Sequence, residues 1–296
     1  MMRNIHKTVN TELRQAHETR KQLFKKIEKK LKGRKLVTFF TSFSFNVDIS
    51  DDDCDMLQSI LQTMDLSNGL ALMVSSPGGD GLAAERIVNT CRAYSGTGDY
   101  WVIVPGKAKS AATIICMGAS KIMMSSSSEL GPVDPQILRI EDGRRKVFSA
   151  HNIVSSYDKL FNEAVSGTGR LEPYLQQLEH FDDRDITTYR SLIKLSEDIS
   201  IKILRSGMMK NLNEADVRDK IKVFLIPDAG TLIHGRPIYL EEVSSCGLKT
   251  ETLDVKDSLW RSVYDLYTRT EWFVSLQVGK AVESEKESFY AQAPDR

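Results

Sequence analysis

The fold is decided by residues 100–124, which read YWVIVPGKAKSAATIICMGASKIMM. Tyr100 to Val104 is an apolar, β-favouring run that Pro105-Gly106 closes. Ala111 to Met117 has the small and apolar residues of a buried helix, and Lys121 to Met124 is a second β-rich run. The stretch therefore predicts strand, turn, helix and strand.

The same alternation extends toward the N-terminus. Leu36 to Phe40 and Gly69 to Ser75 are further strand candidates. Helical periodicity occupies residues 56–64, behind a start signal at Asp51-Asp52-Asp53, and residues 82–94. We interpret residues 35–135 as βαβαβαβ, an α/β fold whose parallel sheet is covered by helices on both faces.

Beyond residue 135 the sequence becomes more helical. Asp142-Gly143 predicts a hairpin turn, followed by a helix at about 151–166 and a long polar helix within 171–207 that stops at Gly207. Residues 256–280 predict a last helix, and we expect a frayed tail from Ser284.

The composition restricts the class of protein. The chain has 296 residues with 40 Lys and Arg against 40 Asp and Glu, and no stretch approaches the roughly 18 apolar residues of a membrane span. The N-terminus begins with charge rather than a secretory signal, so we expect a cytoplasmic protein. Four cysteines without a CxxC pair predict reduced thiols, and we expect neither a metal nor a cofactor.

The zero net charge divides unevenly. Residues 1–35 carry twelve Lys and Arg against three Glu, a net +9, so the other 261 residues carry −9. Apolar residues recur in this segment at helical spacing and predict a basic amphipathic helix: Ile5, Val9, Leu13, Ala16, Leu23, Ile27 and Leu31. We favour packing on its own or a neighbouring subunit over contact with a membrane surface or nucleic acid.

Two turns follow neighbouring predicted strands. Ser75-Ser76-Pro77-Gly78-Gly79-Asp80-Gly81 precedes a helix, so its N–H groups suit an anion or an oxyanion, although a tight turn alone would explain the glycines. Ser110 precedes the small-residue helix, as a nucleophile or as an ordinary N-cap. Both turns lie at the edge where open α/β sheets bind ligands.

These turns and a third motif carry a family resemblance. Ser-Pro-Gly-Gly at 76–79, the Ser110 turn and Glu-Leu-Gly-Pro-Val-Asp-Pro-Gln at 129–136 resemble the Clp-type and signal-peptide-peptidase-type serine peptidases. The match is best to the serine dehydrogenase proteinase family of the ClpP/crotonase superfamily. The similarity extends from about Glu18 to Val165 and resumes at His234 to Ile238 and at Gly247-Leu248.

The resemblance implies a spiral core of repeated ββα units that oligomerises. It also implies a nucleophile at Ser110 and an oxyanion hole from the N–H groups of Gly79 and Ala111, with Gly78 shaping the turn. We expect three segments: the basic helix at 1–34, a peptidase domain at 35–250 with a helical insertion at about 171–220, and a C-terminal helix and tail at 251–296.

The general base is less defined. A Clp-type peptidase would have a histidine where this chain has Asp134-Pro135, and no histidine occurs between Ser110 and His151, which disfavours a Clp-like triad. In related peptidases with a Ser-Lys dyad the lysine comes from a context resembling Asp158 to Val165, which makes Lys159 the candidate base and His151 its rival. We expect His234 to fix a late turn.

The favoured function is a serine peptidase that hydrolyses peptide bonds through an acyl-enzyme at Ser110. One alternative is acyl-CoA chemistry, in which the Gly78 and Gly79 amides would polarise a thioester. Another is a non-catalytic scaffold that binds partners through residues 1–35.

Overall fold

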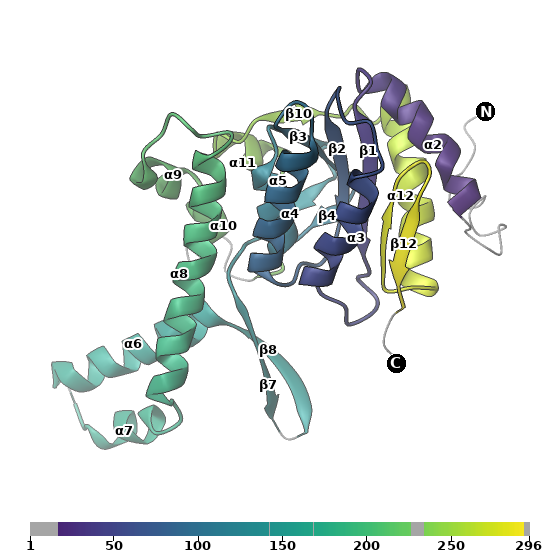
Figure 1. The fold of residues 1–296 in the computed structure, drawn as a ribbon. Helices are drawn as coiled ribbons and strands as arrows, with labels where there is room; N and C mark the ends of the chain where they lie inside the picture. Colours follow the sequence, from purple (N-terminus) through teal and green to yellow (C-terminus); the bar gives the residue numbers. More distant parts are fainter. Residues whose placement is uncertain (1–16, 142, 168, 226–233, 293–296) are drawn as a thin grey trace.

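The computed structural model describes residues 17–141, 143–167, 169–225 and 234–292, and its centre is a seven-stranded sheet (Figure 1). Five strands pair in parallel: β10 (Thr250–Thr252), β5 (Lys121–Met124), β3 (Tyr100–Val104), β2 (Leu70–Ser75) and β1 (Lys35–Thr41). Beyond β1, β11 (Lys280–Glu283) and β12 (Ser288–Ala291) complete the sheet with antiparallel pairing.

Helices cover both faces of this sheet. One face carries α3 (Asp51–Leu61), α4 (Gly81–Tyr94) and α5 (Ala111–Gly118), and the other carries α2 (His17–Lys30) and α12 (Ser258–Leu276). Val37 and Phe39 of β1 enter the first core, whereas Leu36 and Phe40 enter the second, because successive strand side chains point to opposite faces. The α/β class that the sequence predicts is confirmed.

Short strands extend the chain past the ends of the long ones, as repeated ββα units require. β4 (Lys107–Ala108), β6 (Glu129–Leu130) and β9 (Ile238–Tyr239) form a second small sheet. The Ser76 N–H donates to the Lys107 carbonyl at 3.1 Å, and the Lys109 N–H donates to the Ser76 carbonyl at 3.0 Å. These bonds hold the two turns of the carboxyl edge side by side.

An arm projects from the core (Figure 1). It consists of the hairpin β7 (Gln136–Glu141) and β8 (Arg144–Ser149), then α6 (Ala150–Ser166), α7 (Glu172–Leu178) and α8 (Asp183–Arg205). The single long helix expected within 171–207 is instead α7 and α8, because the Asp182 carboxylate accepts the Arg184 N–H and caps a new helix. The chain returns to the core along α8 and continues through α9 (Glu214–Lys220), α10 (Lys222–Leu225) and α11 (Leu240–Ser245).

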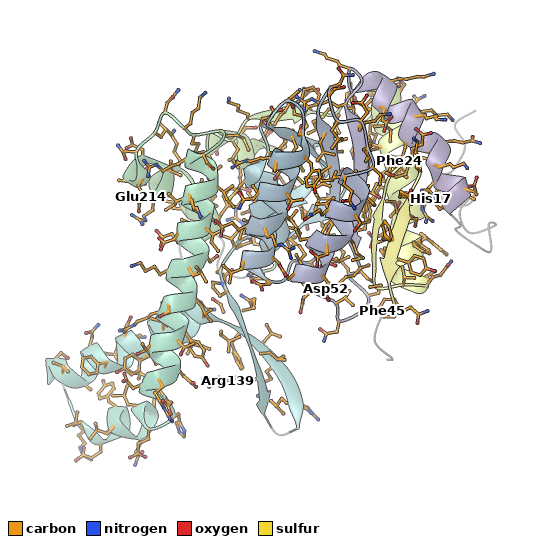
Figure 2. All side chains as sticks on the ribbon, viewed as in Figure 1. His17, Phe24, Phe45, Asp52, Arg139 and Glu214 are labelled. Carbon is orange, nitrogen blue, oxygen red and sulfur yellow. The ribbon has the colours of Figure 1, made fainter. Side chains whose placement is uncertain are left out.

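The basic segment is described from His17, and its first sixteen residues lie outside the described part. Leu23, Phe24, Ile27 and Leu31 of this segment are buried in the core formed with α12 (Figure 2). Arg20, also buried, pairs with Glu283 of β11. This packing favours the structural interpretation of the helix, while contact with a membrane or nucleic acid stays a prediction.

The expectation of a frayed tail is wrong for Ser284 to Ala291. The chain turns back there, and β12 pairs with β11, which itself pairs with β1. β12 pairs with the adjacent β11 as a hairpin, but β11 pairs with β1, which lies more than 200 residues away, so no local pattern indicates that this hairpin joins the central sheet. In the part of the chain that the structure describes, no helix is long and apolar enough to cross a membrane.

Candidate active site

Ser110 has an unusual backbone conformation at the start of α5. Its φ of +51° and ψ of −122° lie in a region that side-chain-bearing residues rarely adopt. Its hydroxyl makes no capping hydrogen bond, which removes the interpretation of Ser110 as an ordinary N-cap. A strained serine between a strand and a helix is the geometry of a nucleophile elbow.

Gly78 permits the close approach of this serine. Its φ is +114°, and a Cβ atom there would lie 2.6 Å from the Ser110 Cβ. The Gly78 N–H donates to Ser76 Oγ at 3.1 Å, so this amide already has an acceptor. Gly78 therefore shapes the turn, as the resemblance implies, rather than supplying an oxyanion donor.

Gly79 packs closely against the backbone of Ile49. With a φ of +148°, a Cβ would stand 2.2 Å from the Ile49 nitrogen. The Ile49 N–H donates to the Gly78 carbonyl at 2.8 Å, and the Asp80 N–H donates to the Ile49 carbonyl at 2.9 Å. Within the described residues, the Gly79 and Ala111 N–H groups have no acceptor on the protein, so both can meet an oxyanion.

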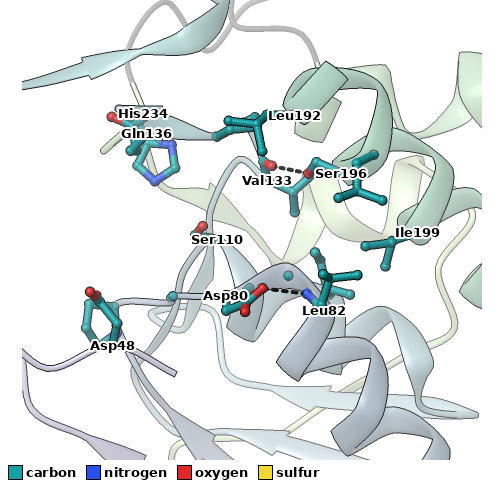
Figure 3. A pocket seen from close by; sticks show the side chains of 17 residues that line it. Asp48, Asp80, Leu82, Ser110, Val133, Gln136, Leu192, Ser196, Ile199 and His234 are labelled. Atoms are coloured by element: carbon teal, nitrogen blue, oxygen red, sulfur yellow. Dashed lines mark hydrogen bonds between the residues drawn. The ribbon is translucent and has the colours of Figure 1, made fainter. Parts of the chain in front are cut away.

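A cleft of about 460 Å³ opens over these turns (Figure 3). Ser110, Gly79 and Ala111 line it, so the structure brings together the nucleophile and both oxyanion donors that the sequence predicts. His234 lines it too, from the segment that leads into β9.

His234 is held by a buried carboxylate. Its Nδ1 lies 2.5 Å from Asp134 Oδ1, and the Asp134 side chain is completely buried, whereas the His234 side chain is 24% exposed. Gln136 Nε2 donates to the other Asp134 oxygen at 2.9 Å. A carboxylate on one ring nitrogen fixes the imidazole and leaves Nε2 for a proton transfer, as in Ser-His-Asp enzymes.

The backbone before Asp134 is fixed from two directions. The Val133 N–H donates to the Phe224 carbonyl at 2.8 Å, and the Val133 carbonyl accepts Ser196 Oγ of α8 at 2.5 Å. These contacts set the position of the carboxylate, and through it that of the imidazole.

The two bases expected from the sequence lie elsewhere. Lys159 is exposed on α6 in the arm and is not among the residues that line the cleft. His151 lines a separate small cavity together with Asp134 and Pro135, and it is not among the residues that line the cleft. The structure therefore does not bring Lys159 to Ser110.

Sequence reasoning did not predict the contact between Asp134 and His234, which are 100 residues apart. Both lie in segments that carry the family resemblance, and this was the available signal. The sequence prediction assumes the chain order of the Clp-type peptidases, whereas the three triad residues occur in different orders on different folds.

Comparisons with known proteins identify the family of the chain. The model of a family of ClpP-like SDH-type serine proteinases matches residues 2–159, which include Ser110 and Asp134. Two uncharacterized proteins of Methanocaldococcus jannaschii are similar: one is 34% identical over 89 residues, 30% of each chain, and the other is 27% identical over 135 residues, 44% of this chain and 42% of that protein. The chain thus spans less than half the length of these relatives. Because the family model matches more than half of its residues, the chain belongs to the ClpP-like SDH-type serine proteinase family.

Proposed function

We propose that this protein is a serine endopeptidase that uses Ser110 as nucleophile and His234, oriented by Asp134, as general base. The observation that carries the proposal is the 2.5 Å contact between His234 Nδ1 and the buried Asp134, at the cleft that Ser110 also lines. We further propose peptide or protein substrates, assembly into a homo-oligomer and a cytoplasmic location.

The reaction follows from these positions. Ser110 Oγ attacks the peptide carbonyl carbon while His234 Nε2 takes the hydroxyl proton. The carbonyl oxygen becomes an oxyanion, which the Gly79 and Ala111 N–H groups bind. The tetrahedral intermediate then breaks its C–N bond, and the imidazolium donates its proton to the leaving amine. Water, deprotonated by His234, hydrolyses the acyl-enzyme and restores the Ser110 hydroxyl.

Burial argues for the histidine over the lysine. A lysine acts as a base where an apolar environment disfavours its ammonium form, and Lys159 is exposed. A histidine has no such requirement, because imidazole titrates near neutral pH. The Ser110–Lys159 dyad remains the competing hypothesis, drawn from the resemblance.

Labelling with a fluorophosphonate probe separates these hypotheses. We expect a covalent adduct on Ser110 in the wild type, none in Ser110→Ala and almost none in His234→Ala. Lys159→Ala and His151→Ala should label as fast as the wild type. Loss of labelling in Lys159→Ala, with labelling retained in His234→Ala, would replace the triad by the dyad. No adduct on the folded wild type would overturn the peptidase proposal.

A further inference from the structure

One wall of the cleft is apolar and comes from the arm. Leu192, Leu195 and Ile199 lie on α8 three and four residues apart, so they share one helix face, and all three line the cleft. Leu82 of α4 and Ile114 of α5 line it as well. Figure 3 shows Leu192 and Ile199 on one side of Ser110 and Asp48 on the other.

This wall has a buried floor and an exposed mouth. Ile114 and Ile199 are only 2% and 4% exposed, and both Cδ1 atoms lie within 4 Å of the position that a Cβ of Gly81 would take. At the mouth, by contrast, Leu82 is 53% exposed and Leu195 is 40% exposed. Single exposed leucines are common, but leucines from two elements that meet in one cleft form a site that an apolar group can cover.

The wall begins close to the nucleophile. The Ile114 N–H donates to the Ser110 carbonyl at 3.3 Å, so Ile114 lies one helical turn after the serine. A side chain next to a peptide bond held on Ser110 is therefore within reach of this wall.

Charge limits which side chains fit. Among the described residues, those that line the cleft include neither lysine nor arginine, whereas Asp48 and Asp80 lie on its Gly79 side. An acidic side chain would lose its hydration without gaining a cationic partner. Lys109 does not compensate, because it pairs with Glu129 at 2.8 Å.

We propose that the α8 wall selects substrates with an apolar side chain next to the cleaved bond, and that acidic residues there are rejected. The proposal rests on the function proposed above. The catalytic serine lies within the segment that the family model matches, whereas the α8 residues of the wall lie beyond it. Selectivity would therefore depend on residues of the arm as well as on Leu82 and Ile114 of the core.

The test uses a mixed library of decapeptides whose cleavage sites are mapped by mass spectrometry. For the wild type we expect apolar residues enriched at one position flanking the cleaved bond. In matched peptides, leucine there should raise kcat/KM at least about tenfold over alanine, and more over aspartate. Leu195→Asp, a change at the exposed mouth that should not prevent folding, should remove this preference and favour lysine or arginine. Leu175→Asp, at a leucine of α7 that is 48% exposed and does not line the cleft, is the matched control.

Binding to Ser110→Ala keeps the test independent of catalysis. Fluorescence anisotropy should show at least tenfold tighter binding of a leucine-centred decapeptide than of its aspartate-centred counterpart, and Leu195→Asp in the same background should abolish the difference. Equal binding of the two peptides, or library cleavage without apolar enrichment, would overturn the inference. A selective wall in a chain that gives no fluorophosphonate adduct would overturn the proposed peptidase activity while leaving the wall as a peptide-binding site.

Discussion

The core and the arm contain the two candidate bases, and they differ in how firmly they hold a side chain. In the core, Ser110, Gly79 and Asp134 lie at the edge of a sheet whose strands are buried on both faces. In the arm, the described apolar cluster has only Ala150, Ile186 and Tyr189 as buried members. Precise geometry requires side chains held in place, and the core provides this for His234 through the completely buried carboxylate of Asp134.

The arm nevertheless contributes to the site. Its helix α8 returns to the core, where Ser196 holds the Val133 carbonyl and the apolar wall faces the cleft. The two proposals therefore place the chemistry in the core and the selectivity in the arm.

The largest expected effect comes from Asp134→Asn. An amide cannot fix the tautomer or balance the imidazolium, so kcat should fall about 10⁴-fold. Asp158→Asn is the matched change in the arm, where this aspartate makes an exposed pair with Arg190 at 2.5 Å. It should alter kcat by less than about twofold, since exposed pairs contribute little. Comparable losses in both variants would contradict the division between core and arm.

Next comes Gly78→Ala. The added Cβ would collide with the Ser110 Cβ, and the backbone at residue 78 has a φ of +114°, which alanine rarely adopts. The Ser110 side chain must therefore shift, and kcat/KM should fall at least about 10²-fold. Gly143 in the arm hairpin also has a positive φ, +70°, but a Cβ added there by Gly143→Ala would meet no atom within 4 Å. It should leave kcat/KM unchanged while costing about 1–2 kcal/mol of stability. Steady-state kinetics and urea denaturation separate the two outcomes.

Truncating buried and exposed phenylalanines should separate the stabilities of the two regions. Phe24 of α2 is fully buried, so Phe24→Ala should lower the free energy of unfolding by about 3–5 kcal/mol. Phe161 of α6 is 48% exposed and stacks on Tyr157 with ring centroids 6.0 Å apart, so Phe161→Ala should cost about 0.5–1.5 kcal/mol. If Phe24→Ala costs no more than Phe161→Ala in guanidinium denaturation, α2 is not part of the core.

The smallest expected effect is on the pH dependence of stability. The pKa values of two carboxyl groups shift in opposite directions. Burial raises the pKa of Glu271, on α12 beneath β2. As pH rises from the usual glutamate range through this raised pKa, the unfolded chain loses its proton first, so stability falls. Glu271→Gln should remove that decline.

In the arm, hydrogen bonds from the Arg184 side chain and backbone lower the pKa of Asp182 to about 2. Its contribution is present above the usual aspartate range and is lost as pH falls toward 2. Asp182→Asn should therefore reduce the loss of stability as pH falls toward 2. Glu271→Gln should instead reduce the loss of stability as pH rises above the usual glutamate range. Denaturation midpoints between pH 2 and 7 test both, and the same slope in the two variants would contradict the assignment.

The two turns of the site could be predicted because each consists of residues that are contiguous in sequence. Gly78, Gly79 and Ser110 follow strands and precede helices that the sequence pattern predicts, and turn geometry is a local property. The attachment of the C-terminal hairpin to the central sheet and the division of α7 from α8 were not predicted, since the first depends on the remote strand β1 and the second on a single cap.

The sequence by itself determined the α/β class, the alternation of strands and helices in the first half of the chain and the place of Ser110 between a strand and a helix, because hydrophobic period and turn residues act over a few positions. Only the tertiary structure decided which base faces the cleft. Whether Lys159 is exposed, and whether His234 meets Asp134, depends on how the arm and the late β9 segment pack against the core. A contact between residues 100 positions apart is fixed by packing and burial, and no local spacing records it.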